Sequence, residues 1–163
     1  MVMGGPGAGK STLARLLGDR TGMPVHHMDH IHYSAGWQPR PQAEKLALHD
    51  AVVAQDDWIF EGGLSSGYEK RAARADLLVF LDVPLVQRLY RVFRRARRYR
   101  GQTRPDMAPG CIERVDPEFL RWMIDNARRI RRRDLALIAR FPDRSRILRT
   151  RRQVARFLDE IAP

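Results

Sequence analysis

Short apolar runs and longer segments of helical periodicity alternate along the chain. The runs lie at residues 58–60, 77–81 and 147–148, an apolar pair stands at residues 2–3, and residues 24–28 read as a further short strand. Continuous apolar runs of this kind are typical of strands buried on both faces, as in parallel sheets. Strands that alternate with helices predict an α/β fold, in which a parallel sheet carries helices on both faces.

Helical spacing of apolar residues predicts the intervening helices. We expect them after residue 10, after residue 41, over 68–75, after residue 84, over 116–141 and around residue 154. In the helix after Pro41, the expected inward side holds Leu46, Ala47, Asp50, Val53 and Ala54. In the helix after Pro84, it holds Leu85, Leu89, Val92, Phe93 and Ala96.

Residues 101–116 interrupt this periodicity with two prolines and a glycine, at positions 105, 109 and 110. The sequence Asp116-Pro117-Glu118 then combines an N-cap residue, a proline at the first helical position and a first-turn acid, which predicts a helix start. The chain contains no internal repeat and no low-complexity linker. We therefore predict one domain over residues 1–163, with a lid insertion at about 97–117.

Composition supports a single globular domain and excludes some classes of protein. The 163 residues are 44% hydrophobic, and no apolar stretch approaches the roughly 20 residues of a membrane-spanning helix. A single cysteine, Cys111, excludes an internal disulfide framework and favours a reducing cytoplasm. Composition leaves both a monomer and a small homo-oligomer open.

Positive charge is concentrated in the second half of the chain. Of the 27 arginines, 22 lie between Arg88 and Arg156, where only seven residues are acidic, so this stretch carries about +15 of formal charge. One interpretation is a surface that binds a polyanion such as nucleic acid. The other is a set of solvated helix faces, and the sequence leaves both open.

The run Gly4-Gly5-Pro6-Gly7-Ala8-Gly9-Lys10-Ser11-Thr12 fits the P-loop pattern G-x-x-x-x-G-K-[ST]. Its glycines allow a tight turn whose successive N–H groups point at phosphate oxygens, and the following helix adds its positive N-terminal end. Lys10 reaches the β- and γ-phosphates in such loops, and the Ser11 hydroxyl ligates Mg²⁺. We therefore predict ATP and Mg²⁺ as ligands, held by Gly5, Gly7, Ala8, Gly9, Lys10, Ser11 and Thr12.

Few residues precede this loop. Only residues 1–3 stand before Gly4, whereas a strand usually needs about five or six residues. We therefore expect the numbering to begin a few residues late on the first strand.

Three carboxylates follow predicted strands and compete for the metal. Asp82 ends the most apolar run, as the acid of a nucleotide-binding site commonly does, and Glu61 is followed by two glycines that allow close approach of a ligand. Asp29 opens a loop that we expect to face the phosphate acceptor. Because ligands sit at the carboxyl ends of parallel strands, all three are candidates. We assign Asp29 to acceptor binding or proton removal and Glu61 to the metal.

Two further groups of side chains suggest chemistry. His26, His27, His30 and His32 surround Asp29, but strand alternation would divide them between two faces, so we expect buried, satisfied or solvent-facing histidines and no transition-metal site. Arginines recur at helical spacing from residue 88 to residue 98, directly before the predicted lid. This placement suits a helix that brings cations to a closing lid, although a solvated helix face would show the same spacing.

Across nearly its full length, the chain resembles the adenylate-kinase-like P-loop proteins of the FlaR-related "topology modulation protein" group. The matching segments include the P-loop, Gly36-Trp37, Asp57-Trp58-Ile59 and the run Arg100-Gly101-Gln102-Thr103-Arg104-Pro105-Asp106-Met107. This resemblance implies a nucleoside-monophosphate-kinase fold, with a five-stranded parallel sheet and a short lid. It also implies Arg91 on the adenine side, Arg95 at the transferring phosphate, and Arg149 through Arg151 beside the adenine.

The chain departs from the group's pattern at two places. The usual Asp-Gly-Asn-Tyr after the third strand is replaced by Glu61-Gly62-Gly63-Leu64, which keeps an acid but lengthens it. His30 and His32 stand where other side chains are usual, so we expect the acceptor specificity to differ.

These observations lead to two functional hypotheses. The first is an ATP-dependent phosphotransferase for a small acceptor (a nucleoside, a nucleotide or a hydroxyl compound), with Lys10, Asp29 and Arg95 as catalytic residues. The second is a nucleic-acid-associated ATPase or nucleotide-switched regulator that uses the basic surface of residues 88–156. The sequence does not identify the acceptor.

Overall fold

The structure is a computed structural model that describes residues 1–63 and 65–161; Leu64, part of the altered motif after the third strand, lies outside the described residues. The strands are β1 Val2–Met3, β2 Val25–His27, β3 Tyr33–Ser34, β4 Gln38–Pro39, β5 Ile59–Glu61, β6 Leu78–Leu81 and β7 Ser145–Leu148. The helices are α1 Lys10–Thr21, α2 Met28–His32, α3 Gln42–Val53, α4 Tyr68–Arg74, α5 Leu85–Arg98, α6 Pro117–Ala139 and α7 Arg151–Glu160.

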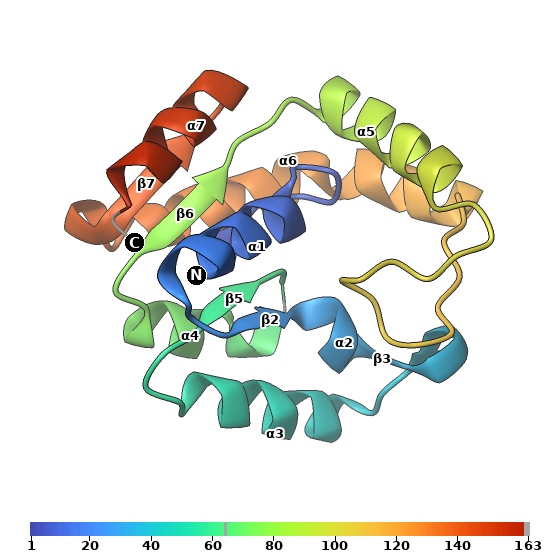
Figure 1. Cartoon of the computed structure of the whole chain (residues 1–163), viewed down its shortest axis with the longest axis horizontal. Coiled ribbons are helices and arrows are strands. Elements are labelled where there is room, and N and C mark those ends of the chain that lie inside the picture. Colours follow the sequence, from blue (N-terminus) through green and yellow to red (C-terminus); the bar gives the residue numbers. More distant parts are fainter. Residues whose placement is uncertain (64, 162–163) are drawn as a thin grey trace.

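A five-stranded parallel sheet forms the centre of the described chain, in the order β2-β5-β1-β6-β7. The central strand β1 leads into the P-loop, and its two neighbours end at Glu61 and Leu81. Figure 1 shows helices flanking this sheet. The predicted α/β fold, a parallel sheet with helices on both faces, is therefore confirmed.

Two hydrophobic cores lie on the two faces of the sheet, because successive strand residues point to opposite sides. In β1, Met3 belongs to one core and Val2 to the other. The Met3 core includes residues of α3, α4 and α6, whereas the Val2 core includes residues of α1 and α7. The three central strands β5, β1 and β6 are buried on both faces, which explains why they read as continuous apolar runs.

Two predicted strand ends are wrong by one residue, and both corrections change the element to which a site residue belongs. The chain leaves β2 after His27, and Met28 begins the short helix α2, so Asp29 lies in a helix and not at a strand end. Met28 is fully buried in the core there, which turns the chain back against the sheet. The third strand is Ile59–Glu61, so Glu61 is its last residue and not the residue that follows it.

Two predicted helix faces also need correction. On α3, His49 and Val53 are buried, whereas Ala47 and Ala54, which we expected inside, are exposed. On α5, Phe93 is 52% exposed, and Arg88 takes a buried position together with Val92. A buried histidine and a buried arginine fill places that apolar patterning assigns to other residues.

The segment 99–116 joins α5 to α6 and has no helix of its own; we call it the lid segment. Figure 1 shows it reaching from the end of α5 across to α2 and β3. The helix start after it is confirmed, because the Asp116 side chain accepts from the Glu118 amide and Pro117 is the first residue of α6. Across the described residues, none of the helices is both long and apolar enough to cross a membrane.

Candidate functional site

The P-loop connects β1 to the first turn of α1 and has a backbone that only glycine adopts easily. Gly7 and Gly9 have φ angles of 75° and 103°, in the left-handed region. The Ala8 amide donates to the Gly5 carbonyl at 3.1 Å, and Lys10 Nζ donates to the same carbonyl at 3.3 Å. Since α1 begins at Lys10, its N-terminal amides adjoin the loop, an arrangement suited to binding phosphate.

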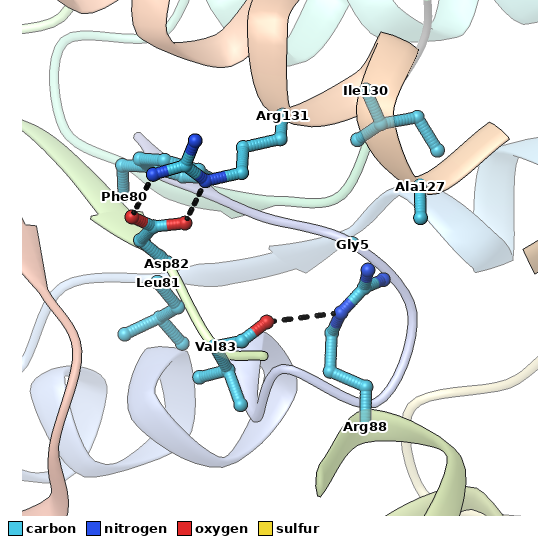
Figure 2. A pocket seen from close by; sticks show the side chains of 9 residues that line it. All are labelled: Gly5, Phe80, Leu81, Asp82, Val83, Arg88, Ala127, Ile130 and Arg131. Carbon is cyan, nitrogen blue, oxygen red and sulfur yellow. Dashed lines mark hydrogen bonds and ion pairs between the residues drawn. The ribbon is translucent and has the colours of Figure 1, made fainter. Parts of the chain in front are cut away.

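Helix α5 packs directly behind the loop. A Cβ atom on Gly5 would lie 2.0 Å from Arg88 Nη1, and one on Gly7 would lie 2.5 Å from the Arg88 carbonyl oxygen. Arg88 is 6% exposed and donates from Nε to the Val83 carbonyl at 3.1 Å. Figure 2 shows its guanidinium beside the loop at Gly5, facing a cavity of about 20 Å³. Glycine is required at these two positions because α5 occupies the space of a side chain.

Glu61 lies below the loop and contacts its serine. Glu61 Oε1 accepts from the Ser11 hydroxyl at 2.9 Å and lies 2.8 Å from His27 Nδ1. Burial raises the pKa of Glu61, but hydrogen bonding from His27 and the charge of Lys10 outweigh it, so the pKa is below its ordinary value. The carboxylate is therefore negatively charged at neutral pH.

These residues fit Mg²⁺. The Ser11 hydroxyl directs its proton to Glu61 Oε1, which leaves the oxygen lone pairs available to a cation. Hydroxyl and carboxylate oxygens are the ligands that Mg²⁺ prefers, and such sites retain several waters and substrate phosphates. A bound Mg²⁺ would neutralise phosphate charge, and Ser11 and Glu61 are the residues that would hold it directly or through water.

Asp82, the competing carboxylate, is engaged elsewhere. Arg131 donates to both of its oxygens, at 2.7 and 2.9 Å, and Arg149 donates to Oδ2 at 3.2 Å. Arg131 first, and Arg149 less strongly, hold the pKa of Asp82 below its ordinary value. Figure 2 shows the paired Asp82 and Arg131 across the small cavity from Arg88. Asp82 thus joins β6 to α6 and to the segment before α7.

Asp29 stands in the first turn of α2, under the lid segment. Its Oδ2 lies 4.0 Å from Arg104 Nη2, and its side chain remains 44% exposed. Its partial loss of contact with water beneath the surrounding chain first, and the charge of Glu61 second, raise the pKa of Asp29 above its ordinary value, although Lys10 and Arg104 oppose them. A carboxyl group with a raised pKa is a better proton acceptor than an ordinary aspartate.

Three arginines expected near the adenine line one cavity. Arg91, Arg149 and Arg151 surround a space of about 390 Å³ together with Gln87 and Tyr90. Arg91 also donates from Nη1 to the Ala8 carbonyl at 2.8 Å, so the cavity adjoins the P-loop. Its size and position suit the base and sugar of a nucleotide whose phosphates lie on the loop.

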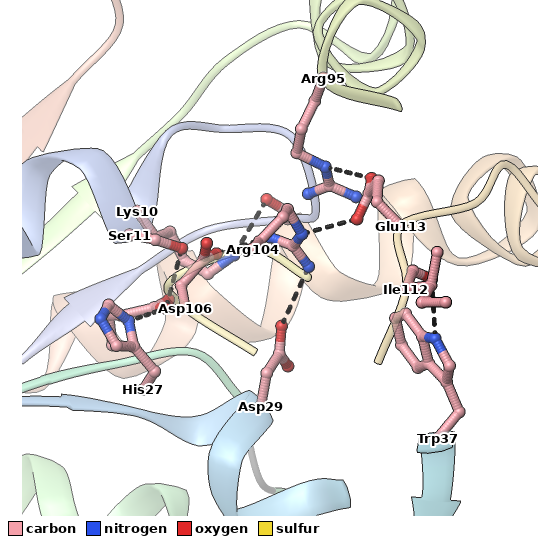
Figure 3. Close-up of polar contacts among 12 residues, drawn as sticks. Lys10, Ser11, His27, Asp29, Trp37, Arg95, Arg104, Asp106, Ile112 and Glu113 are labelled. Carbon is pink, nitrogen blue, oxygen red and sulfur yellow. Dashed lines mark hydrogen bonds and ion pairs between the residues drawn. The ribbon is translucent and has the colours of Figure 1, made fainter. Parts of the chain in front are cut away.

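The lid segment carries a chain of ion pairs that runs from α5 towards Asp29 on α2, shown in Figure 3. Arg95, in the last turn of α5, donates from Nε to Glu113 Oε1 at 2.7 Å. Arg104 Nε lies 2.6 Å from Glu113 Oε2, and Arg104 Nη1 donates to Asp106 at 2.5 Å. The predicted catalytic residue Arg95 is thus joined through Glu113 to a second arginine that lies near Asp29.

A small apolar contact holds the lid segment against the β3–β4 region. Met107 and Cys111 are buried against Tyr33 and Trp37. The Trp37 amide donates to Cys111 Sγ at 3.2 Å, and the indole Nε1 donates to the Ile112 carbonyl at 2.9 Å. Trp37 adopts a positive φ of 64°, which is rare for a bulky residue. The lid segment therefore lies closed over the site.

Several site residues were not assigned a role from the sequence: His27, Arg104, Asp106 and Glu113. The resemblance marked the run that contains Arg104 and Asp106 but assigned these residues no role. His27 did not stand out from its neighbouring histidines, and its hydrogen bond to Glu61 spans 34 positions of sequence.

The structure also places the histidines around Asp29 and the arginines of α5. Because α2 begins at Met28, the strand alternation expected for the histidines stops at His27. In the described parts of the chain, no group of histidine, cysteine and acidic side chains is arranged to hold a metal ion by itself. Of the α5 arginines, Arg88, Arg91 and Arg95 point towards the loop or the lid segment, whereas Arg94 and Arg98 are exposed.

Comparisons with known proteins support the fold. No protein-family profile matches the chain, and a search of curated proteins finds no match. A gluconokinase from Sinorhizobium meliloti 1021 superposes with a TM-score of 0.55 and 15% sequence identity, over 98% of this chain and 86% of the gluconokinase. A sugar kinase from Janibacter sp. HTCC2649 superposes with a TM-score of 0.50 and 15% identity, over 97% of this chain and 90% of the kinase. The chain therefore has the fold of P-loop kinases.

Proposed function

We propose that this protein is an ATP-dependent phosphotransferase that moves the γ-phosphoryl group to the hydroxyl of a small acceptor. The observation that carries the proposal is the contact between the Ser11 hydroxyl and the buried carboxylate of Glu61, at 2.9 Å. It places a hydroxyl and a negative charge side by side at the end of the P-loop. Metal-bound phosphates on the loop would use both groups.

Each remaining part of the site has a role in this reaction. Lys10 binds the β- and γ-phosphates, and Arg95 compensates the charge of the transferring group. Asp29 orients the acceptor hydroxyl and receives its proton, which its raised pKa favours. The cavity beside Arg91, Arg149 and Arg151 takes the adenosine, and the closed lid segment excludes water, which would otherwise compete as acceptor.

The candidate acceptors come from the structural neighbours and from the resemblance to nucleotide kinases. The structural neighbours are named as a gluconokinase and a sugar kinase, so sugars and sugar acids join nucleosides and nucleotides as candidates. We also propose membership of the FlaR-related "topology modulation protein" group, because Arg104 and Asp106, from the run most specific to that group, lie at the site. Fold analogy alone does not choose an acceptor.

The test is Mg²⁺-dependent release of ADP from ATP, measured alone and with a panel of sugars, sugar acids, nucleosides and nucleotides. Stimulation by one acceptor would support the proposal and identify the substrate. Lys10→Ala should lower turnover by about 10³-fold with the fold intact, because it removes a cation from the transferring phosphates. Lys45→Ala, on the distant helix α3, is the matched control. Normal turnover in folded Lys10→Ala would refute this mechanism.

A second candidate is a nucleic-acid-associated ATPase or nucleotide-switched regulator. It is favoured by exposed arginines on the outer sides of α5, α6 and α7, including Arg94, Arg97, Arg128, Arg132 and Arg152. Binding to duplex DNA would then weaken steeply with salt, and DNA would stimulate ADP release. Absence of both effects at low salt would exclude this candidate.

A further inference from the structure

Glu113 is a buried carboxylate that bridges two arginines from different parts of the chain. Its side chain is 1% exposed, and each oxygen meets one guanidinium. Oε1 accepts from Arg95 Nε at 2.7 Å, and Oε2 forms an ion pair with Arg104 Nε at 2.6 Å, as Figure 3 shows. Arg95 comes from the end of α5 and Arg104 from the lid segment. One carboxylate therefore sets the positions of both cations.

The contact with Glu113 leaves the outer edge of Arg95 available. Arg95 is anchored through Nε, and among the described residues no hydrogen bond or ion pair uses its Nη1 or Nη2. A guanidinium held in this way presents two parallel N–H donors, the arrangement that matches two phosphate oxygens. An anchored arginine also loses less rotational freedom when it binds than a free one.

Arg104 is also incompletely satisfied. It is 5% exposed, and Nη1 donates to Asp106 at 2.5 Å. Its Nε lies close to Glu113 but outside hydrogen-bonding geometry, so this buried N–H has no hydrogen-bond partner within the described chain. Buried guanidinium groups need anionic partners in good geometry. Glu113 and Asp106 cover Nε and Nη1, so the nitrogen that could meet a phosphoryl oxygen is Nη2, which lies 4.0 Å from Asp29.

The arginine pair lies next to the phosphate loop. Burial raises the pKa of Asp106, but the charge of Arg104 outweighs it together with nearby polar groups, so the pKa is below its ordinary value. Arg104 donates to this carboxylate, and Figure 3 shows Lys10 and Ser11 beside the two residues. Phosphates bound by Lys10 would extend towards the two guanidinium groups.

We propose that Glu113 is a positioning residue for phosphoryl transfer: it holds Arg95 and Arg104 as a pair that contacts the transferring group from the lid side. This inference rests on the proposed phosphotransferase function. Two guanidinium groups close together repel each other, and the carboxylate between them offsets that repulsion. Asp106 offsets the charge of Arg104 as Glu113 offsets that between the arginines, so the positive charge that stabilises the moving phosphoryl group is the guanidinium edge that Arg95 presents.

A purely structural role for Glu113 can be separated from this one. The Glu113 amide donates to the Gln102 carbonyl at 2.9 Å, and bridge pairings join Arg100 to Glu113 and Thr103 to Ile112. These backbone contacts hold the lid segment together whatever side chain is present at 113. The substitution Glu113→Gln therefore removes the carboxylate charge and keeps the backbone pairing.

The two roles predict different kinetics. If Glu113 positions the arginines, Glu113→Gln lowers kcat by about 10-fold to 100-fold, the value of one or two charge-assisted contacts at the transition state. The KM for ATP stays within about threefold or falls, because removing a negative charge near the phosphates does not weaken their ground-state attraction. Collapse of the lid segment would instead raise the KM for ATP together with the loss of kcat.

The experiment measures ADP release with saturating Mg²⁺ and the acceptor that stimulates the wild type. Glu118→Gln, which removes an exposed carboxylate from the first turn of α6, is the matched control and should match the wild type. Glu113→Asp should be intermediate, because its shorter carboxylate can reach only one arginine. Arg95→Lys combined with Glu113→Gln should lose less than the two single losses together predict, because Arg95 is one of the two arginines that Glu113 holds.

Each outcome decides the matter. Wild-type kcat in Glu113→Gln, a matching rise in KM, or losses that add in the double variant would overturn the positioning role while leaving the phosphotransferase intact. If the wild type releases no ADP with any acceptor, the proposed function fails and this inference fails with it. If Glu113→Gln unfolds below the assay temperature, Glu113→Asp and Arg95→Lys decide between the two roles. A lower kcat with an unchanged KM for ATP in these variants supports positioning, and a lower kcat with a raised KM supports a structural role.

Discussion

Glu61→Gln is the substitution that most directly tests the metal site. Glu61 is 3% exposed, and a single oxygen, Oε1, meets both the Ser11 hydroxyl and His27 Nδ1. Glutamine has the same shape but no charge, and its carbonyl oxygen is a weaker acceptor. The variant therefore keeps the packing and removes the negative charge next to the Ser11 hydroxyl.

The expected effect can be estimated from the contacts that are lost. Hydrogen bonds to a charged acceptor contribute about 1.5–3 kcal/mol each, and glutamine weakens both of the bonds that Glu61 accepts. Loss of a carboxylate that orients or holds a metal ligand typically lowers metal affinity by about 10-fold to 100-fold. We expect the Mg²⁺ concentration for half-maximal ADP release to rise by the same factor.

Asp82→Asn is the matched control because it removes the same charge just after strand β6, which lies on the other side of β1 from β5. Asp82 pairs with Arg131 and Arg149, and both arginines are more than half exposed. Its loss should lower the free energy of unfolding by about 1–2 kcal/mol, since the partners are solvated but the carboxylate is largely buried. The Mg²⁺ requirement should not change.

The assay is a Mg²⁺ titration of ADP release at saturating ATP, with urea unfolding of each variant as the stability measurement. A shift in the Mg²⁺ midpoint for Asp82→Asn, with none for Glu61→Gln, would refute our assignment and restore Asp82 as the metal carboxylate. Equal shifts in both variants would show that long-range charge, and not the Ser11 contact, sets the metal affinity.

Three further predictions follow from the same geometry. Gly5→Ala should weaken nucleotide binding about 10-fold or more by calorimetry, because its Cβ would overlap Arg88 Nη1 at 2.0 Å, and Arg88→Met should recover part of the loss; an unaffected Gly5→Ala would contradict the packing. Trp37→Ala should make the lid segment a faster site of limited proteolysis, because the indole anchors it; equal cleavage rates would contradict this anchoring. Because Glu61 helps to raise the pKa of Asp29, the rise of kcat/KM with pH should move to lower pH in Glu61→Gln at saturating Mg²⁺; an unmoved profile would exclude Asp29 as the titrating group.

Much of the fold was predictable because its signals are local. The apolar runs identified the strands of the parallel sheet, and Asp116-Pro117-Glu118 located the start of α6 to the residue. The P-loop pattern located the phosphate site, since the turn and the helix that follow it are encoded within nine consecutive residues. Local patterns of this kind do not depend on partners elsewhere in the chain.

The strand ends and inward helix faces were less predictable, because tertiary packing decides them. His49 and Arg88 are polar residues that become buried against Phe60 and the P-loop, respectively, and apolar periodicity cannot show this. The turn from β2 into α2 depends on Met28 entering the core beside Gly62. Nothing within residues 24–32 signals that packing partner.

The carboxylate and histidine contacts beneath the lid segment were missed because they are long in sequence. Glu113 meets Arg95 at a separation of 18 residues, and His27 meets Glu61 at a separation of 34. Each residue alone resembles any other charged residue on a helix or loop. Only the folded chain shows which of the many arginines have a buried carboxylate as their partner.

The same network bears on the choice between the two functional candidates. Buried cations without complete partners are costly, and two of the four in the described residues lie at the phosphate loop or beneath the lid segment: Arg88 Nη1 and Arg104 Nε have no hydrogen-bond partner there, as do nitrogens of Arg40 and Arg71 elsewhere. Arginines on the outer faces are exposed and already solvated. A nucleotide phosphate on the P-loop would bring negative charge to the costly positions, whereas a polyanion on the outer surface would leave them unchanged. The distribution of buried charge therefore favours phosphoryl transfer at the loop over binding of nucleic acid.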